Sequence, residues 1–474
     1  MSPPQPPGIP FPPDKIQDLV EADHRHLWHP FTQMQEWYGQ PCLIVAAAEG
    51  CWLIDAEGRR YLDGVSSLWA NVHGHRRKEL DEAIRNQLDR VAHTTLLGLA
   101  HPAAIELARE LAASAPKGLT RVFFSDNGST AVEAALKIAF QYWEQQKDER
   151  KRTKRRIVSF RNAYHGDTLG AVSVGGVDLF HERYRPLLFP SAKVPYPYCY
   201  RCHLGLARPG CGMACADELE DLLEREGLST AALIIEPLVQ GAAGMIVAPE
   251  GFLKRVETIC RKHEVLLIAD EVAVGFGRTG TLFACEQENV RPDLMALAKG
   301  IAGGYLPLAA TLTTEEIYEA FLGEVAEAKT FFHGHTFTGN PLACAAALAS
   351  LEIFRRERLL ERIQPKIRHF ASRLEAFREL ESVGDVRRKG LMAGIELVAD
   401  KETKRPYPVD KRVAVKVILE ARRRGLVIRP LGDVVVLMPP LAVTIEELDR
   451  ILDVTYESID IVTRAVRAEG KGKS

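Results

Sequence analysis

Short, continuous apolar runs alternate with helical patterns through the middle of the chain. Residues 265–269 (VLLIA) and 294–298 (LMALA) contain no polar side chain, which is typical of strands buried on both faces of a parallel sheet. Short, mostly apolar stretches that also predict strands occupy 121–124, 156–160 and 232–235. Because helical patterns separate several of these runs, the sequence predicts an α/β fold with a mostly parallel sheet and crossover connections.

Two of these runs end in residues that are costly to bury. Asp270 follows the run at 265–269, and Lys299 follows the run at 294–298, with glycines close behind it. Ligands bind at the carboxyl ends of the strands in open α/β sheets. An acid and an amine at two such ends suit an enzyme of pyridoxal 5′-phosphate (PLP), in which the lysine forms a Schiff base and the acid pairs with the ring nitrogen. Taken singly, Lys299 could be a solvated strand end and Asp270 a cap or turn residue.

A third component is a polar turn between a strand and a helix. Residues 125–130 (SDNGST) follow the run at 121–124, and apolar residues then recur at helical spacing. Thr130 and Glu133 have the spacing of a capping box, which predicts the helix start. Free N–H groups at such a start make Gly128 and Ser129 candidates for holding a phosphate group.

A competing interpretation comes from residues 275–280 (GFGRTG), which match the GxGxxG pattern of dinucleotide-binding proteins. That pattern requires a helix to open at its last glycine and an acidic residue about 20 positions further on. Neither is visible here. A nucleotide-binding dehydrogenase, or a relative without catalytic activity, nevertheless stays open as an alternative from another functional class.

Composition limits the possible partners and the location. The 474 residues carry a net charge of −2 and are 46% hydrophobic, which is ordinary for a soluble globular protein. This balance gives no reason to expect a nucleic acid partner, and no apolar run is long enough for a membrane span. Residues 1–14 are rich in proline and lack the pattern of a signal peptide, so we expect a flexible tail. Nine cysteines without such a signal favour a reducing, cytoplasmic location.

Four of the cysteines cluster as two close pairs. They are Cys199, Cys202, Cys211 and Cys215. Paired cysteines of this kind are typical of structural zinc sites, although the spacing between the pairs is short. The interpretation we favour is a surface loop without metal, and a structural zinc ion is the alternative.

Several longer segments match a known family. SDNGS, YHGD, EPLVQG, ADEVAVGFGRTG, LAKG and HGHTFTGNPLA together resemble the class III (fold-type I) PLP aminotransferases over nearly the whole chain. HLWHPFTQM, SSLWANVHGH, GYLPLAATLTT and VIRPLGDVVVLMPP resemble more narrowly the branch that converts 8-amino-7-oxononanoate to 7,8-diaminononanoate in biotin biosynthesis. Another class III transaminase, acting on a different ω- or α-amino acid, is the alternative within the same fold.

The resemblance implies a large PLP-binding domain with a mostly parallel sheet and a smaller α+β domain. The expected divisions are a tail at 1–14, a segment at 15–70 that joins the small domain, the large domain at 71–345 with a cysteine-rich insertion at 196–216, and the small domain at 346–474.

The resemblance also implies roles for individual residues at the cofactor. Lys299 would bind PLP covalently and move the proton, and Asp270 would hold the ring nitrogen. The other cofactor-binding residues would be Gly128, Ser129, Tyr164 and Gln240, together with His335 and Thr336. In the family the segment of Gly334, His335 and Thr336 comes from a second subunit, so the resemblance implies a homodimer with shared active sites.

For the substrates, the resemblance implies that Trp69 and Tyr164 line the keto-acid pocket, that Arg429 binds the carboxylate and that Arg278 orders the donor site. The expected donor is S-adenosylmethionine. Phe31 stands where members that use this donor typically have tyrosine, and residues 96–101 and 406–412 look closer to the branch that uses lysine. Lysine therefore stays open as the amino donor.

Overall fold

The computed structural model describes residues 9–471, so most of the tail expected at 1–14 lies outside the described residues. Where that tail is described, the expectation is wrong at its end, because helix α1 (Pro13–His26) already begins at Pro13. Proline suits this position, since it has no N–H group to leave unpaired in the first turn.

A seven-stranded sheet forms the centre of the large domain. Its strands, in spatial order, are β4 (Leu119–Ser125), β12 (Ala309–Thr314), β11 (Leu294–Leu297), β10 (Leu266–Asp270), β7 (Thr230–Ile235), β5 (Arg156–Phe160) and β6 (Ala192–Val194). Strand β10 runs parallel to both β7 and β11, while β12 is antiparallel to both of its neighbours. The predicted, mostly parallel sheet is confirmed, with β12 as the reversed strand.

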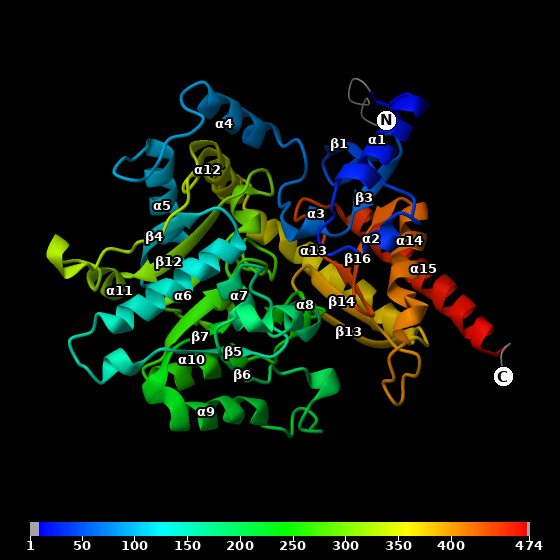
Figure 1. Ribbon diagram of the computed structural model, residues 1–474. Helices are drawn as coiled ribbons and strands as arrows, with labels where there is room; N and C mark the ends of the chain where they lie inside the picture. The colour runs from blue at the N-terminus through cyan, green and yellow to red at the C-terminus, as the bar shows by residue number, and fades with distance from the viewer. Residues whose placement is uncertain (1–8, 472–474) are drawn as a thin grey trace.

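Helices cover both faces of this sheet, which explains the unbroken apolar runs. In β10, Leu266 and Ile268 pack in the hydrophobic cluster of α6 (Gly128–Glu144), which lies across the strands in Figure 1. Leu267 and Ala269 point the other way, into the cluster that contains α9 (Ala214–Glu226) and α10 (Phe252–Lys262). Successive side chains alternate between the faces, so every position of the strand must be apolar.

The small domain is built from both ends of the chain (Figure 1). One sheet has the order β13 (Val383–Lys389), β14 (Met392–Leu397), β17 (Val434–Leu437) and β16 (Arg429–Leu431). A second sheet joins β1 (Val45–Glu49), β2 (Trp52–Asp55) and β3 (Arg60–Asp63) to β15 (Leu426–Val427), which runs parallel to β3. The helices of this part are α13 (Leu359–Leu374), α14 (Val413–Arg423) and α15 (Ile445–Lys471).

The remaining α-helices and strands are α2 (Met34–Trp37), α3 (Ser66–Trp69), α4 (Lys78–Leu88), α5 (Pro102–Ser114), α7 (Leu169–Val174), α8 (Asp178–His181), α11 (Glu315–Glu319), α12 (Pro341–Arg356), β8 (Val239–Gln240) and β9 (Ile246–Val247). Between residues 9 and 471, no helix is both long enough and apolar enough to cross a membrane.

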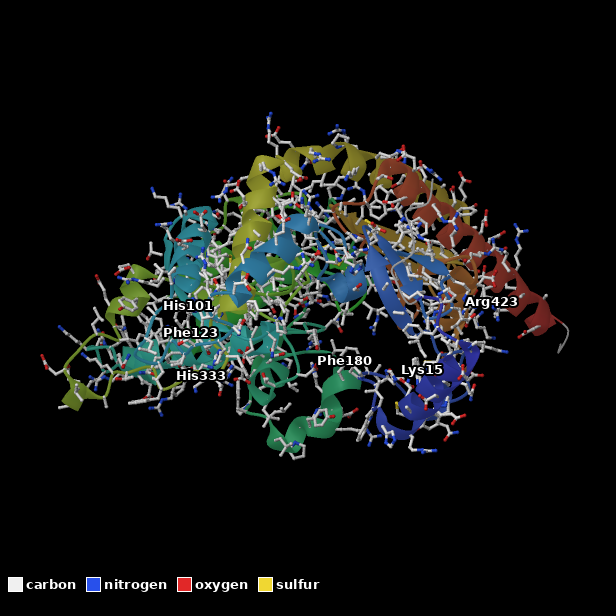
Figure 2. The ribbon with its side chains drawn as sticks, turned by 90° about the horizontal axis from the view of Figure 1, so that it is seen from above. Lys15, His101, Phe123, Phe180, His333 and Arg423 are labelled. Atoms are coloured by element: carbon white, nitrogen blue, oxygen red, sulfur yellow. The ribbon has the colours of Figure 1, made fainter. Side chains whose placement is uncertain are left out.

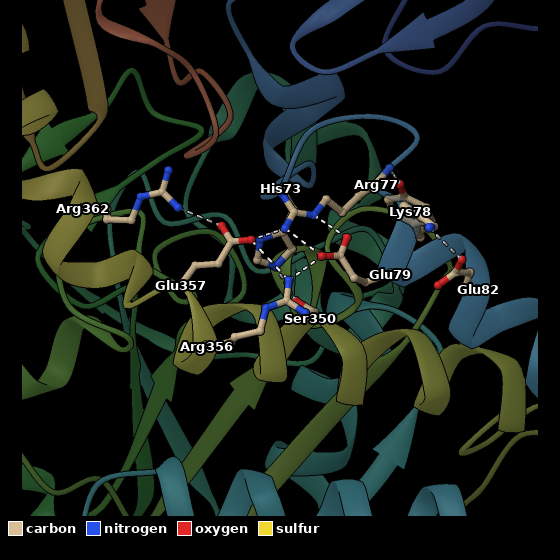
Figure 3. Close-up of polar contacts among 10 residues, drawn as sticks. His73, Arg77, Lys78, Glu79, Glu82, Ser350, Arg356, Glu357 and Arg362 are labelled. Atoms are coloured by element: carbon tan, nitrogen blue, oxygen red, sulfur yellow. Dashed lines mark hydrogen bonds and ion pairs between the residues drawn. The ribbon is translucent and has the colours of Figure 1, made fainter.

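An ionic network joins the start of α4 to the end of α12 (Figure 3). The Arg77 Nε donates to Glu79 over 2.7 Å, and Arg77 also pairs with Glu357 beyond the end of α12. Glu79 in turn pairs with Arg356, the last residue of α12. Beneath the network the buried His73 Nε2 lies 2.9 Å from the Ser350 hydroxyl, and burial lowers the pKa of His73 to about 3. The network therefore ties the chain after residue 69 to α12.

Candidate active site

A cavity of about 480 Å³ opens at the carboxyl ends of the central strands. Six of the residues predicted from sequence line it, namely Trp69, Gly128, Ser129, Tyr164, Asp270 and Lys299. The topology explains how they meet, because β10 and β11 are parallel neighbours and Asp270 pairs in register with Ala296, three residues before Lys299.

Asp270 is held by two donors at the end of β10. Its Oδ2 lies 2.7 Å from the Nδ1 atom of His165, and its Oδ1 accepts the Val272 backbone N–H over 3.0 Å. The Asp270 side chain is only 4% exposed. The second ring nitrogen of His165 is buried and has no hydrogen-bond partner among residues 9–471. This pair fixes the orientation of the carboxylate within the cavity.

Lys299 follows β11 in a strained conformation. Its φ of +44° lies in the left-handed region, which a residue with a side chain adopts at a cost. The amine lies 5.5 Å from the centre of the Trp69 ring, and burial lowers the pKa of Lys299 while the nearby Asp270 and Glu236 oppose that change. Strain of this kind concentrates at functional sites, and here it aims the amine into the cavity.

Glu236, just after β7, is a second buried carboxyl group in the cavity. It accepts the backbone N–H of Tyr164 over 3.1 Å and that of Gly241 over 2.9 Å. Burial raises the pKa of Glu236 to about 7, with the nearby His165 lowering it and Asp270 raising it further. This carboxyl group therefore joins two loops that follow separate strands.

The helix that follows β4 begins earlier than the sequence predicts. The predicted capping box of Thr130 and Glu133 is wrong: Asn127 is the N-cap, its side chain accepts the Thr130 N–H over 3.2 Å, and α6 starts at Gly128. Glu133 instead accepts the backbone N–H of Gly170. The shift leaves the N–H groups of Gly128 and Ser129 in the first turn, without an acceptor among residues 9–471.

Two glycines keep this end of the cavity open. Gly166 has a φ of +117°, and a Cβ atom there would lie 1.9 Å from the Ser129 hydroxyl oxygen. A Cβ at Gly128 would lie 2.6 Å from a methyl group of Val272. The exposed helix N-terminus is therefore accessible to an anion, as the sequence predicts for a phosphate group.

Arg278 lies beside the cavity and not in its lining. Its fully buried guanidinium donates to the carbonyls of Pro439 (2.9 Å), Asn71 (2.6 Å) and Trp69 (3.3 Å), and to the Ser66 hydroxyl (3.0 Å). Residues 66–69 all have positive φ angles. Arg278 thus holds the strained turn that presents Trp69, and the glycine-rich stretch at 275–280 is the loop that carries it. No helix opens at Gly280, so the dinucleotide interpretation is wrong.

The other predicted residues lie outside the cavity lining. The Gln240 side-chain amide donates to the Arg161 carbonyl over 3.0 Å, and its oxygen is buried with no hydrogen-bond partner in the part of the chain that the structure describes. Phe31 is 60% exposed and makes edge contacts with Tyr164 and Phe180. Arg429 begins β16, and in the described part of the chain its guanidinium pairs with no carboxylate.

The segment of Gly334, His335 and Thr336 also lies outside the lining, although it begins close to it. The His335 Nδ1 is 2.8 Å from Asp126, a residue of the cavity wall. The neighbouring His333 stacks near Phe123, as Figure 2 shows at one end of the molecule. The structure therefore does not bring Gly334 or Thr336 to the cavity of their own chain.

All four clustered cysteines line one small pocket as free thiols. Burial raises the pKa of Cys199, and it raises that of Cys215 to about 11. Within residues 9–471 no three His, Cys, Asp or Glu side chains are arranged to hold a metal ion.

Sequence reasoning assigned no role to His165, Glu236 or Asp126. Each follows an apolar run directly or within a few residues, which is the signal that identified Asp270 and Lys299. What the sequence could not provide is the pairing of His165 with Asp270, because 105 residues separate them.

Comparison with known proteins identifies the family. The family model described as Aminotransferase class-III matches residues 33–459, which is most of the chain. The chain belongs to the class III aminotransferases.

Similar members of this family come from several organisms. The adenosylmethionine-8-amino-7-oxononanoate aminotransferase of Geobacter sulfurreducens is 57% identical over 94% of this aminotransferase and 98% of its own length. The protein of the same name from Nitratidesulfovibrio vulgaris is 58% identical over 94% of this chain and 82% of its own. The crystal structure of the enzyme of that name from Methanocaldococcus jannaschii has a TM-score of 0.89 at 46% identity, covering 94% of this chain and 99% of that one.

Proposed function

We propose that this aminotransferase uses PLP to convert 8-amino-7-oxononanoate to 7,8-diaminononanoate in biotin biosynthesis, with S-adenosylmethionine as the amino donor. The names of the relatives that are 48–58% identical support the substrate and the donor. The observation that carries the proposal is the presence of Asp270 and Lys299 at adjacent strand ends in one cavity.

The residues present fit PLP. Unpaired N–H groups of Gly128 and Ser129 at a helix N-terminus suit its phosphate group, and the two glycines at 128 and 166 leave space there. The buried Gln240 oxygen, which has no partner within the described chain, suits the ring hydroxyl. Asp270 is oriented to meet a protonated ring nitrogen. When bound, the cofactor supplies an electron-withdrawing ring that stabilises negative charge at the substrate carbon.

Asp270 would keep that ring nitrogen protonated. Opposite charges about 4 Å apart attract by about 4 kcal/mol at an effective dielectric constant of about 20, which corresponds to about three decades in protonation. The bond from His165 and the N–H of Val272 hold the carboxylate in place for this contact.

Lys299 would take the proton from the substrate carbon and return it at the next position. A neutral amine is needed for the first step, and burial lowers the pKa of Lys299 toward the range in which that form is populated. The Trp69 ring, held by Arg278, forms the wall beside the amine and limits how substrates approach it.

Arg429 would bind the carboxylate of the keto acid. Partial desolvation lowers the pKa of Arg429, which remains exposed at the start of β16, and no acid in the described chain pairs with its guanidinium. Because it is planar and has no acidic partner in the described chain, the Arg429 guanidinium can form a bidentate hydrogen bond with a carboxylate.

The enzyme would act as a homodimer in the cytoplasm, with Gly334, His335 and Thr336 completing the partner's cavity. These residues do not line the cavity of their own chain. Phe332 and Phe337, on either side of them, are 79% and 59% exposed, as an unpaired interface would be.

The deciding experiment supplies purified enzyme with PLP, 8-amino-7-oxononanoate and either S-adenosylmethionine or lysine, and measures 7,8-diaminononanoate by mass spectrometry. Product with S-adenosylmethionine is the expected result. Product only with lysine would assign the other donor, which Phe31 at the mouth beside Tyr164 favours. Absence of product with both, alongside transfer to another keto acid, would refute the substrate and leave a different class III transaminase.

A further inference from the structure

A second cavity, of about 450 Å³, lies in the small domain between the β2–β3 hairpin and the end of α14. Four arginines line it, Arg59, Arg60, Arg422 and Arg423, and we call it the arginine pocket. Leu43 and Leu419 add apolar surface, and no aspartate or glutamate is part of the lining. Figure 2 shows Arg423 at the opposite end of the molecule from His333, so the arginine pocket is separate from the segment next to the active site.

Two of these arginines already have acidic partners outside the pocket. Arg59 contacts Asp55 and Glu57, each over 2.8 Å, and Arg423 contacts Glu420 over 3.2 Å. The Arg59 and Arg423 side chains are 57% and 79% exposed, so both guanidinium groups lie at the rim of the pocket, although Asp55, the partner of Arg59, is itself buried.

The other two, Arg60 and Arg422, have no acidic partner within residues 9–471. Arg422 is half-buried, and burial lowers its pKa; the neighbours that oppose this change are the Tyr61 hydroxyl and the Cys42 thiol, both neutral at pH 7. The Arg60 Nε is buried with no hydrogen-bond partner in the described chain, while its guanidinium lies 5.0 Å from the Trp52 ring centre. Two partly buried cations thus face the pocket without an acidic partner among residues 9–471.

Two other arginines of the described chain also have a pKa that burial lowers. In the described chain, burial lowers the pKa of three arginines, namely Arg278, Arg422 and Arg429. Arg278 is compensated by backbone carbonyls and a hydroxyl group. Arg429 is the residue to which a substrate carboxylate is assigned above. Arg422 remains without a ligand or a partner, although it lies in a cavity with three more cations.

We propose that the arginine pocket binds the phosphate group of a small organic phosphate, whose apolar part lies against Leu43 and Leu419. Converging guanidinium groups suit a doubly charged oxyanion, because each can donate two parallel hydrogen bonds. A single carboxylate would leave part of this positive charge uncompensated. The inference does not depend on the substrate or the donor of the active site.

The test uses the PLP-loaded enzyme, so that the cofactor occupies the other phosphate-binding site, and phenyl phosphate as the probe. Isothermal titration at constant ionic strength should show tighter binding of phenyl phosphate than of benzoate. Arg422→Met should weaken it by about tenfold or more, since a charge-assisted contact is lost. Arg150→Met, which removes an exposed arginine that pairs with Asp148, is the matched control and should leave binding unchanged.

Inorganic phosphate is titrated in parallel, and it should bind more weakly than phenyl phosphate. Equal affinity for the two would show that Leu43 and Leu419 do not contribute to binding, and would overturn the proposed role of an apolar group on the ligand. Arg422→Lys keeps the charge and loses the planar donor pair, and it serves if the methionine variant does not fold. Binding that is equal in wild type and both variants, or that chloride at the same ionic strength abolishes, would overturn the proposal.

Discussion

The Nδ1 atom of His165 lies 2.7 Å from the Oδ2 atom of Asp270, and both side chains are almost fully buried. The histidine follows β5 and the aspartate ends β10, so the bond joins two strand ends separated by β7. The bond leaves the second histidine nitrogen without a partner in the described chain and the carboxylate aimed at the cavity. The Asp270 carboxylate is thus held in place by His165, a residue 105 positions away in sequence.

Replacing Asp270 by Asn should lower kcat by about three decades, since the charge that holds the ring proton contributes about 4 kcal/mol. Steady-state rates and the absorbance of bound cofactor would be measured together, because the variant should keep its cofactor. Asp293→Asn is the control: Asp293 pairs with Arg261 at the amino end of β11, so its loss should reduce stability and leave kcat close to wild type. A D270N enzyme with wild-type kcat would exclude the assigned role.

Lys299→Ala should no longer bind PLP covalently. Borohydride reduction followed by mass spectrometry should show one cofactor attached to the wild-type chain and none to the variant. Lys193 is the matched control, because burial also lowers the pKa of its amine, to about 8. Unlike Lys299, it lies outside the cavity lining, where its amine donates to the Ser191 hydroxyl. Lys193→Ala should be labelled like wild type; a labelled K299A chain would show that another lysine binds the cofactor.

Gly166→Ala should lower the free energy of unfolding by about 3 kcal/mol and weaken PLP binding. The added Cβ would meet the Ser129 oxygen at 1.9 Å, and the φ of +117° is itself unfavourable for alanine. Chemical denaturation and cofactor titration measure the two effects. Gly432→Ala is the control that introduces backbone strain without a steric clash, because Gly432 has a φ of +57° and open space around it. This change should lower the free energy of unfolding by about 1 kcal/mol and leave PLP affinity unaltered.

Glu236→Gln should change how stability depends on pH. Burial raises the pKa of Glu236 from 4.5 to about 7, so the folded state retains a proton that the unfolded state releases. Its contribution is fully present below about pH 4.5 and is lost as pH rises through 7. Between pH 4.5 and 8 the cofactor-free wild type should therefore lose up to about 3 kcal/mol relative to the variant.

Urea denaturation of both proteins at pH 5 and pH 8 measures this difference. Glu271 has a pKa raised to about 7 by the same cause, but it is present in both proteins and cancels in the comparison. Parallel pH profiles for wild type and E236Q would contradict the assignment of the proton to Glu236.

The sequence predicts those parts of the structure that local pattern determines. The runs at 265–269 and 294–298, which form most of β10 and β11, are apolar at every position because helices cover both faces of the sheet, and this pattern can be read directly from the sequence. The sequence could place Asp270 and Lys299 in one site because each follows a buried apolar run, and the two strands that contain these runs are parallel neighbours in the sheet. Thr444 and Glu447 cap the final helix as their spacing predicts, each side chain accepting the backbone N–H of the other.

Contacts between distant segments could not be predicted in this way. Thr130 and Glu133 have the spacing of a capping box. The Thr130 N–H, however, donates to the Asn127 side chain, and the Glu133 carboxylate accepts the Gly170 N–H instead. The burial of Arg278 under residues 66–69 depends on the packing of three separate segments. The backbone carbonyls that accept hydrogen bonds from Arg278 could not be identified from the sequence, because every residue has a backbone carbonyl.

The parallel pairing of β3 with β15 has a consequence for synthesis of the chain. Leu62 pairs with Leu426 and Asp63 pairs with Val427, so strands β1, β2 and β3 gain the fourth strand of their sheet only after more than 360 further residues have been made. All strands of the seven-stranded sheet lie between these points in sequence, so that sheet can assemble before β15 is available to β3. A truncation before residue 426 should thus leave the amino-terminal strands without an edge to dock on, exposed to proteases even when the larger domain has folded.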